Sequence, residues 1–184
     1  MIPRKSWHIR YSCFLAFSLA LCTSRPIASP QVTSSESSLR VAFVFSIAKF
    51  IEWPEAEFTG PITICAANPL PETQEALNQL HGKTLQGKSV NVVLLSAKQV
   101  SANQLDGCRL LYQEAESDVA FSSQLPLGTV FIRDHSSVSN LPPSIVLWLG
   151  TDGHLNFSVD RTRLASTGAK VSSQLLKLAK PPRD

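Results

Sequence analysis

The sequence predicts an α/β protein, with a single domain whose mixed β-sheet is flanked by helices and which ends in an antiparallel hairpin and a C-terminal helix. Short apolar runs typical of buried strands alternate with helical patterns from residue 39 to residue 132. Such alternation indicates a sheet that begins with parallel strands and carries helices on its faces. Two further strand patterns then follow each other across a Gly-Thr-Asp-Gly turn at residues 150–153, which predicts a hairpin. The length of 184 residues suits one domain.

The first helix is predicted over residues 39–53, with Ser38 as its N-cap and Pro54 at its end. Its apolar side chains gather on one arc at 100° per residue, which predicts a buried face. The members of this face are Leu39, Phe43, Val44, Ile47, Ala48, Phe50 and Ile51.

Two aromatic residues of this segment lie outside the predicted core face. Phe45 and Trp53 fall at the margins of the opposite arc, with Lys49 between them. They either pack under a neighbouring loop or form part of a protein-binding surface, because aromatic side chains are enriched in such surfaces.

The remaining elements are predicted from shorter patterns. Runs rich in apolar and β-branched residues indicate strands, and caps, prolines and glycines mark the helix ends. The predicted strands are residues 62–66, 90–95, 108–112, 129–132, 145–149 and 154–159. The predicted helices are residues 71–80, 97–105, 161–166 after the N-cap Asp160, and 172–180, with a weakly helical connection over 116–125.

The first 24 residues have the pattern of a cleavable signal peptide. A basic segment that ends at Arg10 precedes twelve uncharged residues, too few to span a bilayer as a helix. We expect cleavage between residues 24 and 31, a flexible lead-in over 25–38 and a folded domain over 39–180. Lipid attachment at Cys22 is the alternative, but Leu21 stands where a small residue is needed.

Removing this segment also removes the net charge. Three of the 17 basic residues lie in the first ten positions, and without them basic and acidic side chains balance at 14 each. The composition therefore gives no support for nucleic-acid binding.

Cys65 and Cys108 are the cysteines that remain after cleavage. In an oxidising compartment a disulfide between them is the leading hypothesis. The alternative is a redox-active pair, but such pairs usually have close spacing, as in C-x-x-C, and a nearby base.

The known patterns of catalytic and cofactor sites are missing from the sequence. It contains neither a nucleotide-binding glycine loop nor histidines at metal-ligand spacing, so we predict no catalytic residue, no metal and no cofactor. Asp134, His135 and Ser136 are consecutive, and neighbouring side chains in an extended loop point apart, so they cannot form a hydrolase triad. We expect them in a polar surface loop.

Three segments together resemble the YfiR family of small bacterial periplasmic regulators. Phe45-Ser-Ile-Ala-Lys49-Phe50-Ile-Glu-Trp53-Pro54 is similar to the family's F-x-x-x-K-F-x-x-W-P opening. Gly87-Lys-Ser-Val-Asn-Val and Leu105-Asp-Gly-Cys108-Arg-Leu-Leu-Tyr112 resemble two of its strands. Leu155-Asn-Phe157-Ser-Val-Asp160 and the segment from Gly168 to Ala179 resemble its C-terminal signature.

This resemblance implies a periplasmic repressor rather than an enzyme. Such a protein binds the periplasmic domain of an inner-membrane diguanylate cyclase and lowers cyclic-di-GMP production and biofilm formation. The resemblance also implies a homodimer that binds no nucleotide and is not inserted in the membrane after cleavage, and it supports pairing of Cys65 with Cys108. We expect Phe45, Lys49 and Trp53 to contact the partner. The alternative function is a periplasmic ligand- or protein-binding module that serves a sensor kinase or a transport system.

Overall fold

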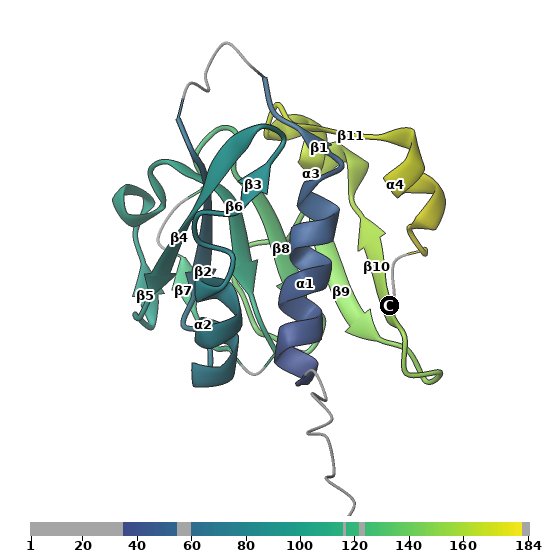
Figure 1. The fold of residues 1–184 in the computed structure, drawn as a ribbon, viewed down its shortest axis with the longest axis horizontal. Helices are drawn as coiled ribbons and strands as arrows, with labels where there is room; N and C mark the ends of the chain where they lie inside the picture. Colours follow the sequence, from purple (N-terminus) through teal and green to yellow (C-terminus); the bar gives the residue numbers. More distant parts are fainter. Residues whose placement is uncertain (1–34, 55–59, 116, 122–123, 182–184) are drawn as a thin grey trace, which may run out of the picture. The chain divides into compact units, whose positions relative to one another are not determined.

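The computed structural model describes residues 35–54, 60–115, 117–121 and 124–181, all of them within a unit that spans residues 33–184. The predicted signal peptide and most of the predicted lead-in lie outside the described residues. The described elements (Figure 1) are, in chain order, α1 (Glu36–Ala48), β1 (Ile51–Glu52), β2 (Ile62–Ala67), α2 (Pro71–Asn78), β3 (Thr84–Leu85), β4 (Lys88–Leu95), β5 (Gln99–Val100), η2 (Ala102–Leu105), β6 (Cys108–Gln113), β7 (Ala120–Phe121), β8 (Val130–Asp134), β9 (Ile145–Leu149), β10 (Leu155–Val159), α3 (Arg161–Ser166), β11 (Lys170–Val171) and α4 (Ser173–Leu178).

A seven-stranded mixed sheet forms the centre of this unit, as the sequence predicts. Its strand order is β10-β9-β8-β6-β2-β4-β3. The five inner strands from β9 to β4 are parallel, whereas β10 and β3 pair antiparallel at the two edges. The predicted hairpin is β9 and β10, in which Leu149 lies opposite Leu155.

The two faces of the sheet carry two separate hydrophobic clusters. Because strand side chains alternate between faces, Ile62 and Ile64 of β2 point to one cluster and Cys65 and Ala67 to the other. Figure 1 shows α1 and α2 across the same face of the sheet, and their apolar side chains join the first cluster. The second cluster includes residues of β5, η2 and β7.

The first helix differs from its prediction at both ends. It begins at Glu36, where the Ser35 hydroxyl accepts a hydrogen bond from the Ser38 backbone N–H, and it ends at Ala48. The prediction of helix through residue 53 is wrong because residues 51 and 52 form β1, which pairs antiparallel with β11. Leu39 was expected in the core but its side chain is 46% exposed.

The two predicted helices on the other side of the sheet are also wrong. Residues 97–105 hold the short strand β5 and the 3₁₀ helix η2 instead of an α-helix. The described part of residues 116–125 holds β7, which pairs in parallel with β5. Both segments are too short and too weakly periodic for the pattern to separate helix from strand.

The two predicted C-terminal helices are confirmed, although α4 ends at Leu178 rather than at residue 180 and the strand β11 between them was not predicted. The Asp160 carboxylate accepts a 3.0 Å hydrogen bond from the backbone N–H of Arg163 at the start of α3. Ser172 caps α4 in the same way, and Leu164 and Leu175 are buried in the cluster on the α1 side.

Candidate functional site

Phe45 and Lys49 lie together on α1 and the turn that follows it. The Phe45 side chain is partly buried and packs against the hydrophobic cluster on the α1 side of the sheet, whereas the Lys49 side chain is exposed. The Lys49 Nζ atom lies 5.1 Å from the centre of the Phe45 ring, within the range of a cation–π contact. The structure therefore places two of the three predicted contact residues side by side at the surface.

Trp53 is not part of this surface. Its side chain is only 9% exposed, and its indole N–H donates a 3.0 Å hydrogen bond to the Gly128 carbonyl in the loop before β8. The expectation of an exposed Trp53 is wrong, and the alternative that it packs against a neighbouring loop describes it. A buried indole needs an acceptor for its N–H, which this loop supplies.

The segment between Lys49 and Trp53 is fixed by contacts from two other parts of the chain. The Gln86 side-chain amide donates hydrogen bonds to the carbonyls of Ala48 (3.2 Å), Lys49 (3.2 Å) and Ile51 (2.6 Å). On the other side, the Ser172 N–H donates to the Phe50 carbonyl at 3.0 Å. The bonds to Ala48 and Lys49 satisfy carbonyls that the end of α1 leaves without intrahelical partners, and those to Phe50 and Ile51 hold the chain where it enters β1.

Gln86 is a residue that the sequence analysis did not single out. It lies in the two-residue turn between β3 and β4, where its φ of 51° is in the left-handed region. Gly87, the second residue of the turn, is typical of two-residue hairpins, but nothing local indicates that the Gln86 side chain reaches α1.

A cluster of buried charged groups connects α1 to the end of the sheet. Arg40 is buried, and its guanidinium binds Asp134, the last residue of β8, and also Glu36 through contacts of 2.6 and 3.0 Å. The expectation of Asp134 in a surface loop is wrong, since only 2% of it is exposed. The neighbouring His135 and Ser136 are exposed as expected.

A second buried carboxylate holds the start of α2. Glu114, which follows β6, accepts hydrogen bonds from the Leu70 backbone N–H and the Thr73 hydroxyl. A negative charge at this position also interacts favourably with the N-terminal end of the helix dipole. Each of the two helices on this face is therefore held by one acidic side chain at the C-terminal end of a parallel strand. Asp134 of β8 holds α1, and Glu114 after β6 holds α2.

Burial shifts the pKa values of both buried carboxylates, Asp134 and Glu114. Desolvation raises the pKa of Asp134, although the charge of Arg40 acts in the opposite direction. Desolvation likewise raises the pKa of Glu114, against the hydrogen bonds from Thr73 and Leu70. The Tyr112 hydroxyl is buried in the same region, and within the described residues it has no hydrogen-bond partner.

Cys65 and Cys108 form a disulfide between β2 and the start of β6. Their Cα atoms are 5.8 Å apart, and both residues are buried in the cluster on the face opposite α1. The bond connects residues 43 positions apart in sequence. Its burial between two central strands fits a structural role.

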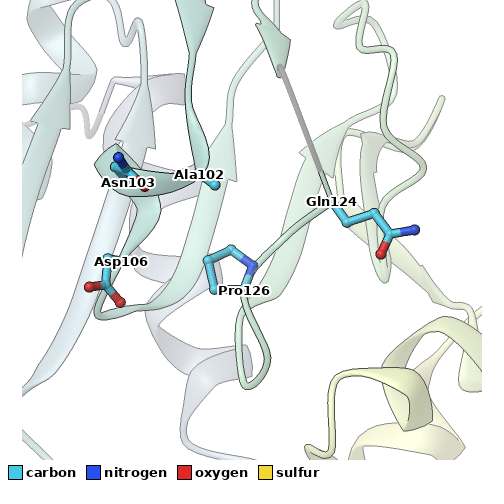
Figure 2. A pocket seen from close by; sticks show the side chains of 5 residues that line it. All are labelled: Ala102, Asn103, Asp106, Gln124 and Pro126. Carbon is cyan, nitrogen blue, oxygen red and sulfur yellow. The ribbon is translucent and has the colours of Figure 1, made fainter.

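The structure also contains an open pocket on a different part of the domain (Figure 2). It has a volume of about 340 Å³ and lies between η2 and the loop before β8. Its polar lining residues, Asn103, Asp106 and Gln124, are all exposed. The described residues that line this pocket include no buried polar side chain of the kind that orients a specific ligand.

Within the described part of the chain, no three histidine, cysteine, aspartate or glutamate side chains are grouped closely enough to hold a metal ion. No helix in the same ranges combines the length and the apolar character that a membrane span requires.

No curated protein matches the chain. The family model described as YfiR/HmsC-like matches residues 37–180, which include every described helix and strand except the first residue of α1. The chain therefore belongs to the YfiR/HmsC-like family.

Proposed function

We propose that this chain is a periplasmic negative regulator that binds the periplasmic domain of an inner-membrane diguanylate cyclase and so lowers cyclic-di-GMP production and biofilm formation. The observation that carries the proposal is the family match over residues 37–180. The signal-peptide pattern of residues 1–24 supports export to the periplasm. We further propose that the mature chain acts as a homodimer and without catalysis.

The proposed contact surface is centred on Phe45 and Lys49. Their ring and ammonium group offer a partner an aromatic contact and a positive charge, and the Gln86 bonds hold the end of α1 in one conformation. A surface fixed before binding loses less conformational entropy when the partner binds. Trp53 contributes indirectly in this proposal, by holding the segment after Lys49 against the Gly128 loop.

Repression requires the chain to distinguish between two states of the cyclase. A regulator that binds the active and inactive conformations equally well shifts neither population. A preference of about 3 kcal/mol for the inactive conformation gives a bias of roughly 150-fold. The binding surface must therefore contact a part of the cyclase that differs between these conformations.

The test begins with affinity capture from native membranes by the mature chain, followed by titration of the purified periplasmic domain of the captured cyclase. We expect Lys49→Glu and Phe45→Ala to weaken binding by about tenfold each, since both remove central contacts. Lys177→Glu is the matched control, because Lys177 is an exposed lysine on α4. Its affinity should equal that of the unmodified chain.

Two outcomes contradict parts of this proposal. Capture of a sensor kinase or an outer-membrane receptor without any cyclase favours the binding-module function instead. Capture of a cyclase whose affinity is unchanged by Lys49→Glu and Phe45→Ala keeps the proposed function but removes the proposed surface.

A further inference from the structure

The charge of the mature chain is unevenly distributed along its sequence. Residues 161–183 contain six basic residues and no acidic one, whereas residues 25–160 contain eight basic and thirteen acidic residues. A neutral mature chain therefore combines a negative main part with a positive C-terminal end. Such a separation of charge gives one end of a protein a field that attracts anionic surfaces.

The described part of this positive segment lies at one side of the domain. It comprises α3, β11 and α4, which Figure 1 shows at the β10 side of the sheet. Leu164 and Leu175 are buried in the cluster on the α1 side, and the Lys180 N–H donates a 2.8 Å hydrogen bond to the Phe157 carbonyl of β10. The segment is therefore a fixed part of the domain.

Most basic side chains of the segment are exposed and unpaired. We define the basic surface by its four exposed members, Arg161, Lys170, Lys177 and Lys180. None of the four forms an ion pair within the described residues, although Lys170 lies opposite Glu52 in the pairing of β11 with β1. Arg163 is not a member, because it pairs with Asp160 at 2.9 Å.

An exposed apolar side chain accompanies the basic surface. Leu178, the last residue of α4, is 65% exposed and lies between Lys177 and Lys180 in sequence. Leu175 of the same helix faces the core, so packing within the domain does not use Leu178. An aliphatic side chain among lysines is typical of membrane-surface segments, in which the apolar group enters the acyl boundary and the lysines extend to the headgroups.

We propose that the basic surface and Leu178 dock this chain on an anionic lipid surface. Each basic residue near such a surface strengthens binding by about fivefold, and the attraction is summed over several exposed charges. No single lysine is therefore essential for docking. The rest of the chain is repelled by the same lipids because of its negative charge, so α4 meets the membrane and α1 stays free to bind another protein.

Two observations favour lipid over an acidic protein as the occupant. Specific protein sites commonly hold a carboxylate with the planar fork of an arginine, whereas three of the four members of the basic surface are flexible lysines. An acidic protein would also leave Leu178 without a contact that a bilayer supplies. The inference goes beyond the proposed function and agrees with it, since an inner-membrane cyclase lies beside a lipid surface.

Vesicle binding of the mature chain tests docking in the absence of any cyclase. Co-sedimentation is measured with phosphatidylcholine vesicles and with vesicles in which about a third of the lipid is phosphatidylglycerol. We expect binding to the anionic vesicles to be at least about tenfold tighter. Raising the salt concentration from about 0.1 M to about 1 M should remove this preference, because salt screens exposed charges. Equal binding to both vesicles, or binding to neither, contradicts the proposal.

Combined charge substitutions locate the docking surface. Arg161→Glu with Lys180→Glu should weaken binding to the anionic vesicles by at least about tenfold. Lys83→Glu with Lys98→Glu is the matched control, because it makes the same change at two exposed lysines elsewhere on the domain, and its binding should stay within about threefold of the original. Equal losses in the two variants indicate attraction by net charge alone and contradict a docking surface.

Leu178 distinguishes a lipid surface from an acidic protein. Leu178→Ser should weaken binding to the anionic vesicles by about fivefold and leave binding to soluble polyglutamate unchanged. Leu149→Ser is the matched control, since Leu149 is a 39% exposed leucine in the β9–β10 hairpin. A Leu178→Ser chain that binds vesicles as tightly as the unmodified chain contradicts lipid as the occupant. Cyclase binding is measured separately, by titration of the periplasmic domain, so failure here does not affect the proposed function.

Discussion

Arg40 connects α1 to the sheet through a buried ion pair with Asp134. Removing one member of such a pair leaves the other charge buried without compensation, which typically costs about 3–5 kcal/mol. We therefore expect Arg40→Ala to lower the free energy of unfolding by about that amount in urea titrations. The exposed Arg161 provides the control, since Arg161→Ala should change stability by less than about 0.5 kcal/mol. Equal effects of the two substitutions would contradict the role assigned to Arg40.

Glu114 allows a prediction about pH. Burial raises its pKa above the ordinary value of 4.5, so the folded chain binds this proton more tightly than the unfolded chain. The stabilising effect of the protonated group is complete below the unfolded pKa and is lost as pH rises through the folded pKa.

A Glu114→Gln variant keeps an oxygen for the Leu70 N–H but cannot ionise. Its free energy of unfolding should therefore increase relative to that of the unmodified chain as pH rises from 4 to 8, because only the unmodified chain loses stability over this range. Urea titrations across this range measure the difference, with Glu72→Gln on the exposed start of α2 as the control. A difference that stays constant or changes in the opposite direction contradicts the raised pKa.

These residues show where sequence analysis reaches its limit. Arg40 and Asp134 are 94 positions apart, so no local pattern could predict that they meet. The expected position of Asp134 in a polar loop suggested that its carboxylate is exposed. Phe45 and Lys49, in contrast, are four residues apart, and helical spacing was enough to place them together.

At the scale of elements, the end of α1 is held by the side chain of Gln86, which lies in the turn between β3 and β4. The two N–H groups of the Gln86 amide are shared among three carbonyls there, and a hydrogen bond contributes about 0.5–1.5 kcal/mol to stability. Gln86→Ala should therefore lower the free energy of unfolding by about 1–2 kcal/mol and increase amide exchange in residues 49–52. Gln174→Ala on the exposed face of α4 is the control, for which no such increase is expected.

Local patterns predicted most strands but not the ends of α1. The runs that became β2, β4, β6 and β8 are bounded by turns and rich in β-branched or aliphatic residues, so their identity follows from composition. The residues of β1 continue the helical periodicity of α1, and their pairing with β11, more than a hundred residues later, overrides it. The helical periodicity of the apolar residues therefore predicted that α1 exists, but it did not predict that the helix ends at Ala48.

At the scale of the whole molecule, the disulfide restricts the unfolded chain. Closing a loop of 43 residues contributes about 4 kcal/mol in the chain-entropy model. The double variant Cys65→Ser with Cys108→Ser should lose a comparable amount in urea titrations. Adding a reducing agent to this variant should change nothing further, whereas the unmodified chain should lose stability to a similar extent. A double variant as stable as the oxidised chain would contradict the structural role.

The mixed parallel and antiparallel character of the sheet follows from alternation along the chain, whereas the proposed function follows from family membership. Parallel strands joined by crossovers and a terminal hairpin were predictable from patterns of a few residues each. The described residues show no catalytic arrangement from which an activity could be derived, so the proposed role rests on the match over residues 37–180.

The central claim is that this chain lowers the output of a diguanylate cyclase, and cellular cyclic-di-GMP is its most direct measure. Deleting the chain from its host should raise the cyclic-di-GMP level, and restoring the unmodified chain should return it to the starting value. Restoring the Lys49→Glu variant should leave the level high, while Lys177→Glu should restore repression. An unchanged cyclic-di-GMP level after deletion would contradict the proposed function.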